Sequence, residues 1–197
     1  MENKKIGKII IISGPSGVGK KTVWTPIIKE PKFNLVFSVS MTTRPKRIGE
    51  IDGTDYFFVT KQKFEEAIVA HELLEYATFA GNYYGTPKKY VDSIREKGQN
   101  VILEIEPKGG LQIMNICKQN KDENILTIFI APPSLGELEK RLINRSSESK
   151  DVIKKRLEQA KWEIQQQKYY QYVIVNNPGQ QEEATKQLFD ILSKNLK

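Results

Sequence analysis

Cysteine and histidine are almost absent from this chain, because each occurs once among 197 residues. A single cysteine, Cys117, excludes an internal disulfide and any cysteine-based metal cluster, and a single histidine, His71, excludes a site with several histidine ligands. We expect Cys117 to fill space in the core and His71 to lie exposed at a helix end. The chemistry of the protein therefore has to come from other side chains.

Long apolar runs are absent as well. The longest run near the N-terminus, residues 9–12, is far below the roughly 20 residues of a membrane span, and residues 1–8 are too polar to open a signal peptide. We therefore expect a cytoplasmic protein that does not bind membranes. Tryptophan is also scarce, and we expect both copies, Trp24 and Trp162, to be packing residues.

The charge balance is basic, with 31 Lys and Arg against 24 Asp and Glu. An excess of 7 positive charges fits nucleic acid, anionic lipid or small polyanions such as nucleotides as partners. The basic residues are dispersed and no nucleic-acid-binding module is evident, so the pattern disfavours nucleic acid.

Short β-branched apolar runs alternate with longer amphipathic segments. The runs, which we expect to be buried strands, span residues 8–13, 35–39, 100–105, 126–130 and 172–176. Helical spacing relates Ile153, Leu157, Ala160 and Ile164, then Ala184, Leu188 and Ile191, and Ser134 with Glu137 forms a capping box. This alternation predicts one α/β domain, a three-layer sandwich around a mainly parallel five-stranded sheet.

Two segments do not follow that alternation. Residues 41–85 are rich in aromatic and turn residues, which favours a small inserted β-rich lobe. The polar stretch 144–150 separates two helical segments and indicates a mobile flap. Insertions between core elements are where ligand-closing lids tend to lie.

A phosphate-binding loop follows the first strand and precedes a helix. Its residues are Gly14, Pro15, Ser16, Gly17, Val18, Gly19 and Lys20. Glycines in such a loop let backbone N–H groups turn toward phosphate oxygens, and the lysine supplies a mobile cation. The next residue is usually Ser or Thr, which reaches magnesium, but here it is Lys21, with Thr22 one place later. We expect Thr22 to bond a different phosphate oxygen, since one residue of helix is about 100° of rotation.

Two further segments, residues 38–58 (SVSMTTRPKRIGEIDGTDYFF) and 81–86 (GNYYGT), resemble the GMP-binding signature of guanylate kinases of the bacterial type. With the phosphate loop before them and three arginines after them, the resemblance covers about residues 8–177. It implies an enzyme that converts GMP and ATP to GDP and ADP, with magnesium accompanying the ATP.

The resemblance assigns a GMP site to the inserted lobe. In this site, two arginines and two tyrosines bind the phosphate of GMP. Glu75 binds the guanine base, with the hydroxyls of Ser38 and Thr86 as further partners. A carboxylate suits guanine because it accepts both donors of one base edge, which adenine does not offer. The matching residues are Ser38, Arg44, Arg47, Tyr56, Glu75, Tyr84, Thr86 and Glu106. From the residues alone, the two arginines are typical of a solvated face and Glu75 of an outward-facing strand residue.

Two carboxylates end the strand predicted at residues 100–105. Strand alternation places Glu104 and Glu106 on one face, at the end of the sheet where open α/β folds bind ligands. By resemblance, Glu104 holds waters of the magnesium shell and Glu106 positions GMP. The family usually has Asp in place of Glu106 and Gln in place of Lys108, and Lys108 either pairs with Glu106 or points away.

The resemblance also assigns the catalytic and ATP-binding residues. Arg141, Arg145 and Arg156 match the lid arginines, which neutralise charge on the transferring phosphoryl group together with Lys20 and Arg44. From the residues alone, the lid arginines are typical of exposed ion pairs with nearby glutamates. Asn176 matches the residue near adenine, and it joins Gly14 to Thr22 in the ATP site. The usual following Asp is here Asn177.

The implied domain is residues 1–197, with a core of 1–37, 87–133 and 168–197, a GMP-binding lobe of about 38–86 and a lid of about 134–167. We expect a monomer or homodimer. Two other classes stay open: an interaction module of the same fold that has lost catalysis, favoured by Lys21, Glu106 and Lys108, and a phosphate-loop protein that acts on nucleic acid.

Overall fold

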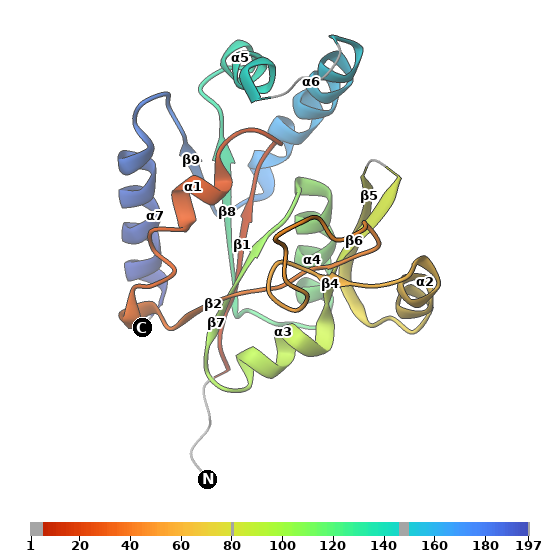
Figure 1. The fold of residues 1–197 in the computed structure, drawn as a ribbon. Coiled ribbons are helices and arrows are strands. Elements are labelled where there is room, and N and C mark those ends of the chain that lie inside the picture. The colour runs from red at the N-terminus through yellow and green to blue at the C-terminus, as the bar shows by residue number, and fades with distance from the viewer. Residues whose placement is uncertain (1–5, 80, 146–149, 197) are drawn as a thin grey trace. The chain divides into compact units, whose positions relative to one another are not determined.

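The structure, a computed structural model, describes residues 6–79, 81–145 and 150–196, without the side chains of 144, 145 and 150–152. Helices and strands alternate along the chain (Figure 1). Their order is β1 (Ile9–Ser13), α1 (Lys20–Trp24), η1 (Pro31–Phe33), β2 (Leu35–Phe37), β3 (Met41–Thr42), β4 (Phe57–Phe58), α2 (Lys61–Val69), β5 (Leu73–Phe79), β6 (Asn82–Pro87), α3 (Lys88–Arg95), β7 (Asn100–Glu104), α4 (Pro107–Gln119), β8 (Ile125–Ala131), α5 (Leu135–Arg145), α6 (Lys150–Gln165), η2 (Gln166–Tyr169), β9 (Tyr172–Val175) and α7 (Gln181–Asn195).

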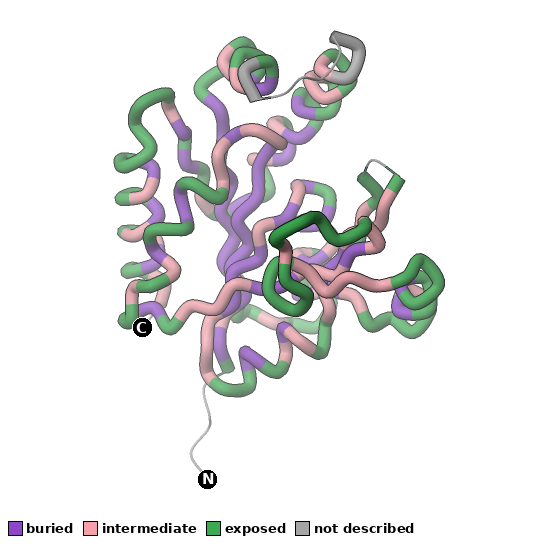
Figure 2. Tube along the Cα trace, viewed as in Figure 1, coloured by how far each residue is buried: buried purple, intermediate pink, exposed green. Residues whose placement is uncertain are grey.

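A five-stranded parallel sheet carries the predicted strands, in the order β2-β7-β1-β8-β9. The α/β prediction and all five strand positions are confirmed. β1 is buried along its whole length, as the purple central trace in Figure 2 shows. A parallel strand covered on both faces has no solvent side, which explains its unbroken run of isoleucines.

A second sheet, in the order β4-β3-β6-β5, lies within residues 41–87 and confirms the inserted β-rich segment. β5 and β6 pair antiparallel, with Glu75 opposite Thr86. The sequence analysis missed α2 in this segment. The hydroxyl of Thr60 caps its start by accepting from the Lys63 N–H at 3.2 Å. Only Phe64 and Ala67 of α2 are buried, so its apolar periodicity is too weak to read.

Two compact units make up the described chain. The first comprises the described residues up to Ile9, Val36–Val101 and Lys108–Ile125, and it contains the second sheet with α2 and α3. The second comprises Ile10–Leu35, Ile102–Pro107 and the described residues from Leu126 on, and it contains α1, α5, α6 and α7. Within the second unit, α7 packs beside α1 and α5 packs on α6 (Figure 1).

Helix α1, which follows the phosphate loop, is only five residues long. The Thr25 N–H donates to the Lys21 carbonyl at 3.0 Å, and the next residue, Pro26, has no N–H to continue the pattern. Because a macrodipole grows from aligned peptide units, so short a helix adds less to anion binding than the sequence pattern suggested.

The structure also tests the predictions made for single residues and for the last helix. Ser134 caps α5, since its hydroxyl accepts from the Glu137 N–H at 3.1 Å. Cys117 is buried and His71 exposed, as predicted. Of the two tryptophans expected to be packing residues, Trp24 is buried and Trp162 is 45% exposed, so Trp162 packs only in part. The buried residues of α7 are Ala184, Leu188 and Leu192, with Leu192 in place of Ile191.

The predicted flap, residues 144–150, is centred on residues 146–149, which lie outside the described residues. In the part of the chain that the structure describes, no helix combines the length and apolar character needed to cross a membrane.

Candidate functional site

The phosphate loop in the second unit has the backbone that its glycines predict. Gly14, Gly17 and Gly19 all have positive φ, a conformation that costs other residues free energy. A Cβ on Gly14 would lie 2.2 Å from the Ile130 carbonyl oxygen, and a Cβ on Gly19 would lie 2.6 Å from Asn176 Nδ2. The loop therefore requires glycine for both backbone conformation and space.

Lys20 folds back over this loop. Its ammonium donates to the carbonyls of Gly14 at 2.8 Å and Pro15 at 3.2 Å. Burial lowers the pKa of Lys20, and the nearby carboxylates of Glu104, Glu163 and Glu106 oppose that shift. The arrangement holds a cation over a loop of inward-turning backbone, which suits the terminal phosphates of a nucleotide.

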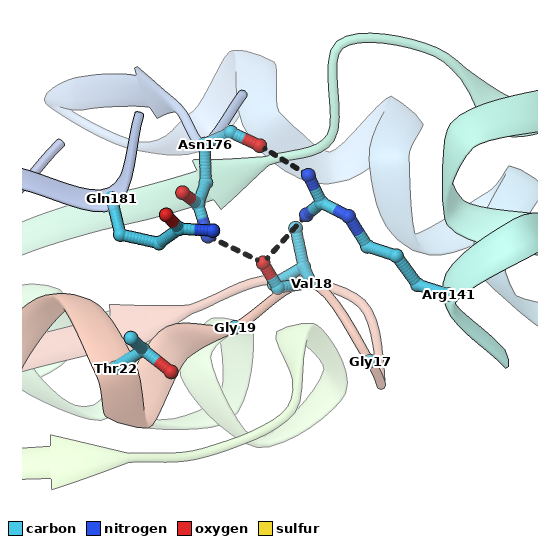
Figure 3. Close-up of a pocket in the computed structure, with 7 residues that line it drawn as sticks. All are labelled: Gly17, Val18, Gly19, Thr22, Arg141, Asn176 and Gln181. Carbon is cyan, nitrogen blue, oxygen red and sulfur yellow. Dashed lines mark hydrogen bonds between the residues drawn. The ribbon is translucent and has the colours of Figure 1, made fainter. Parts of the chain in front are cut away.

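A pocket of about 300 Å³ lies at the phosphate loop (Figure 3). It is lined by Gly17, Val18, Gly19, Thr22, Arg141, Asn176 and Gln181. Thr22 is exposed on α1 and faces this pocket. Gln181, the first residue of α7, is a lining residue that the sequence analysis missed, since an exposed glutamine at a helix start carries no signal.

Arg141 and Asn176 meet at the Val18 carbonyl in this pocket. The Arg141 guanidinium donates to the carbonyls of Val18 at 3.1 Å and Asn176 at 2.8 Å, and Asn176 Nδ2 donates to Val18 at 2.8 Å (Figure 3). Asn176 is 2% exposed, and its Oδ1 has no hydrogen-bond partner among the described residues. A buried acceptor of this kind suits a ligand donor such as an amino group.

The other two arginines of the predicted lid are Arg156 and Arg145. Arg156 is half-buried on α6. Arg145 is the last residue of α5, and its side chain lies outside the described residues. Glu137, one of the glutamates expected to pair with these arginines, does lie 3.4 Å from Arg141.

Carboxylates surround the phosphate loop on the Lys20 side. Glu104 and Glu106 are half-buried and flank the buried Ile105, as strand alternation predicted. Trp24 Nε1 donates to Glu104 Oε2 at 2.6 Å and fixes that carboxylate. Trp24 was predicted only to pack, and this hydrogen bond was not predicted, because 80 residues separate the partners.

Glu163 on α6 is a third carboxylate there, and the sequence analysis missed it. Its side chain is 2% exposed and accepts from Gln159 Nε2 at 2.8 Å and from the Ser16 N–H. Burial raises the pKa of Glu163, and the Glu106 carboxylate adds to the shift. No group of three or more metal-ligating side chains occurs within the described ranges, so these carboxylates do not form an all-protein metal cage.

The first unit brings together the residues expected to read a base. Glu75 on β5 is 7% exposed and accepts from the Thr86 hydroxyl of β6 at 2.6 Å. Ser38 is 3% exposed, and within the described part of the chain its hydroxyl has no hydrogen-bond partner. The expectation that Glu75 faces outward, which its residue pattern alone favoured, was wrong.

Arg44 forms the centre of a second cluster in this unit. Its guanidinium pairs with both oxygens of Glu50, at 2.6 and 3.0 Å, and lies over the rings of Tyr56 and Phe58. The rings of Tyr56 and Tyr84 meet edge to face. The hydrogen bond with Glu50 raises the pKa of Arg44 and lowers that of the Glu50 carboxyl.

Two further residues singled out in the sequence are exposed. Arg47 is exposed, and its N–H donates to Glu50 at 2.8 Å. Lys108, the departure beside Glu106, is exposed on α4. Glu50 was missed because a glutamate in a turn-rich loop reads as a solvated residue.

The α/β sheet, the glycine loop with its lysine and the pocket at the loop define a nucleotide-binding protein of the phosphate-loop class. The comparisons narrow this class: the sequence model of the Guanylate kinase family matches residues 6–195. The chain belongs to that family.

Named relatives agree with this assignment. The chain is 50% identical to a guanylate kinase of Mesoplasma florum over 98% of this chain and 62% of the relative. It is 50% identical to that of Streptococcus mutans over 87% of this chain and 79% of the relative. It also resembles the crystal structure of guanylate kinase from Anaplasma phagocytophilum, with a TM-score of 0.72 and 34% identity over 98% of this chain and 88% of that one.

Each of these relatives is longer than the segment that aligns with this chain. The chain spans about 57–62% of the length of the relatives from Mesoplasma florum and two Mycoplasma species. One of these is a guanylate kinase of Mycoplasma capricolum that is 52% identical over 88% of this chain.

Glu163 generates a prediction on stability against pH. The pKa of Glu163 is higher in the folded protein than in the unfolded chain. At a pH above the folded-state pKa, the charged carboxylate therefore lowers the free energy of unfolding. This destabilisation disappears as the pH falls below the pKa of the unfolded chain. Glu163→Gln should therefore have a higher melting temperature than the parent protein at pH 7, and the difference should shrink toward pH 4.

Thermal unfolding of both proteins across that pH range is the measurement. The parent and the variant share the other charged or titratable groups near residue 163, which are Lys20, Glu106 and Tyr170. The difference in melting temperature between the two proteins therefore reports the Glu163 carboxyl alone. A variant that is less stable at pH 7 by an amount independent of pH would contradict the expectation.

Proposed function

We propose that this protein transfers the γ-phosphoryl group of ATP to GMP and forms ADP and GDP. The observation that carries the proposal is the buried Glu75 carboxylate, held by Thr86, in a chain of the guanylate kinase family. Relatives at about 50% identity are named guanylate kinases, which supports the same activity here.

Guanine is read by hydrogen bonds to Glu75. The base presents two donors, N1–H and the 2-amino group, on one edge, and a carboxylate accepts from both. The hydroxyl of Ser38 supplies a further polar group, and its lack of a partner among the described residues supports a role toward a ligand. Adenine has an acceptor in place of the N1 donor, so it would place acceptor against acceptor in a buried site.

The GMP phosphate is bound by Arg44, Arg47, Tyr56 and Tyr84. Arg44 presents a guanidinium braced by aromatic rings and oriented by Glu50, and the forked geometry of arginine suits phosphate oxygens. Glu106 supplies a carboxylate that helps to position GMP, and one extra methylene relative to Asp changes its reach.

ATP occupies the phosphate loop, from Gly14 to Thr22, with its base toward Asn176. The exposed Lys21 adds positive charge where related loops carry a hydroxyl. Magnesium fits the donor set, because Glu104 lies near Lys20 and this ion is typically bound by one or two carboxylates, phosphates and water. Glu104 would hold the ion through water, and the ion would supply neutralisation of phosphate charge.

Transfer proceeds by in-line attack of a GMP phosphate oxygen on the γ-phosphate. The protein contributes placement and charge neutralisation: Lys20 binds the phosphates of ATP, and Arg141, Arg145 and Arg156 neutralise charge on the transferring group. We assign residues 1–37, 87–133 and 168–197 to the core, about 38–86 to the GMP lobe and about 134–167 to a lid that excludes water. The reaction takes place in the cytoplasm, in a monomer or homodimer.

A coupled assay of ADP formation tests the proposal. The protein is given ATP and magnesium with GMP, AMP or UMP in separate reactions. ADP formation with GMP well above that with AMP and UMP is the expected result. No turnover with GMP, together with binding of GMP, would instead favour an interaction module of the same fold.

Glu75→Gln should weaken GMP use by about 1–3 kcal/mol, because an amide donor then faces the donors of guanine and leaves a buried group mispaired. Selectivity for GMP over AMP should fall with it. The ratio of kcat/KM values for the two nucleotides is the measurement, and an unchanged ratio would remove Glu75 from the base-reading site.

Arg145→Ala should lower turnover by at least about 100-fold and leave GMP affinity nearly intact. The reason is that its contact strengthens as charge develops in the transition state. Steady-state kinetics with GMP varied at saturating ATP separates kcat from KM. Near-normal kcat with a raised KM for GMP would assign Arg145 to substrate binding instead.

A further inference from the structure

Gly109 lies against the carboxylate of Glu75 in the first unit. Gly109 is the third residue of α4, next to β5 and β6 in Figure 1, and it is buried. A Cβ on Gly109 would lie 2.5 Å from Glu75 Oε2, 3.0 Å from its Cδ and 3.3 Å from its Cγ. The distance of 2.5 Å is too short for any side chain, so glycine is required if Glu75 keeps its position.

Backbone conformation gives no reason for a glycine here. Gly109 is helical and is not among the glycines with positive φ. In a helix, glycine is less favourable than alanine by about 1 kcal/mol. The close approach of Glu75 is therefore the feature of this position that excludes a larger residue.

The Glu75 carboxylate is fixed from two sides. Oε1 accepts from the Thr86 hydroxyl at 2.6 Å, across a strand pair in which Glu75 lies opposite Thr86. Oε2 lies over Gly109. A methyl group at residue 109 would displace Oε2, and because Oε1 of the same carboxylate accepts from Thr86, the displacement would disturb that hydrogen bond.

We propose that Gly109 is a positioning residue for guanine selectivity: by lacking a side chain, it sets the place of the Glu75 carboxylate. The inference rests on the proposed function, because it takes Glu75 as the reader of guanine. Two hydrogen bonds from one base edge to one carboxylate require both oxygens near their ideal positions, since hydrogen bonds weaken steeply with distance and angle.

The test is a double-mutant cycle measured by calorimetric binding of GMP and IMP. IMP lacks the 2-amino group and so reports the second hydrogen bond to Glu75. The proteins are the parent, Gly109→Ala, Glu75→Asp and the double variant. Glu75→Asp shortens the side chain by one methylene and withdraws the carboxylate from residue 109.

Gly109→Ala should raise the dissociation constant of GMP at least about tenfold, which lies within the range for an overpacked site. The preference for GMP over IMP should fall toward one. Binding of a non-hydrolysable ATP analogue should change less than twofold. In the Glu75→Asp background, the same Gly109→Ala change should weaken GMP binding less than threefold, because the contact has been relieved.

Gly136→Ala is the matched control. Gly136 lies in the first turn of α5, and a Cβ there would meet only Ser134 Oγ at 4.0 Å. This variant should bind GMP within twofold of the parent. It measures the general effect of a glycine-to-alanine change at a helix start.

Three outcomes would overturn the inference. The first is that the Gly109→Ala variant binds GMP as tightly as the parent and discriminates against IMP to the same extent. The second is an equal loss of GMP binding when Gly109→Ala is introduced into the parent and into the Glu75→Asp variant. The third is a parallel loss of ATP-analogue binding and melting temperature, which would mark a general folding defect. Failure of the parent protein to bind GMP would instead refute the proposed function, so the two failures are distinguishable.

Discussion

The carbonyl oxygen of Val18 is the point on which the geometry of the phosphate loop depends. It accepts from Asn176 Nδ2 at 2.8 Å and from Arg141 at 3.1 Å, and these donors follow it by 158 and 123 residues along the chain. Since a glycine-rich loop has little conformational preference of its own, hydrogen bonds from Asn176, which follows β9, and from Arg141 of α5 supply the order that its sequence lacks. Gly19 makes this possible, because any side chain there would displace the Asn176 amide.

Around the same loop, charge is balanced over short distances. Lys20 is near Glu104, Glu106 and Glu163, and burial works against the charged form of both Lys20 and Glu163. The carboxylates and the carbonyls of Gly14 and Pro15 offset part of the cost of burying the Lys20 ammonium. On the proposed function, Lys20 would exchange its contacts with these two carbonyls for phosphate oxygens.

Local patterns predicted the five strands, the phosphate loop and the inserted β-rich segment, because burial on both faces and glycine spacing are visible within a few residues. They did not predict α2, whose buried face has two residues, nor the exposure of Trp162. Resemblance supplied Glu75 and the arginines as candidates. The partners that hold them, Trp24 for Glu104 and Glu50 for Arg44, were missed, since hydrogen bonds between side chains depend on tertiary geometry that leaves no periodic trace.

The two clusters of the first unit follow different physical rules. Arg44 and Glu50 are a charged pair near solvent, with side chains 13% and 19% exposed, so their contribution to stability is modest and their value lies in orienting a guanidinium. Glu75 is more deeply buried, in surroundings of low dielectric where each hydrogen bond is stronger and each mismatch more costly. On the proposed function, selectivity for guanine is therefore sensitive to small displacements of Glu75, whereas a phosphate bound by charge at Arg44 tolerates larger ones. A residue that leaves space beside Glu75, such as Gly109, then helps to set the position of that carboxylate.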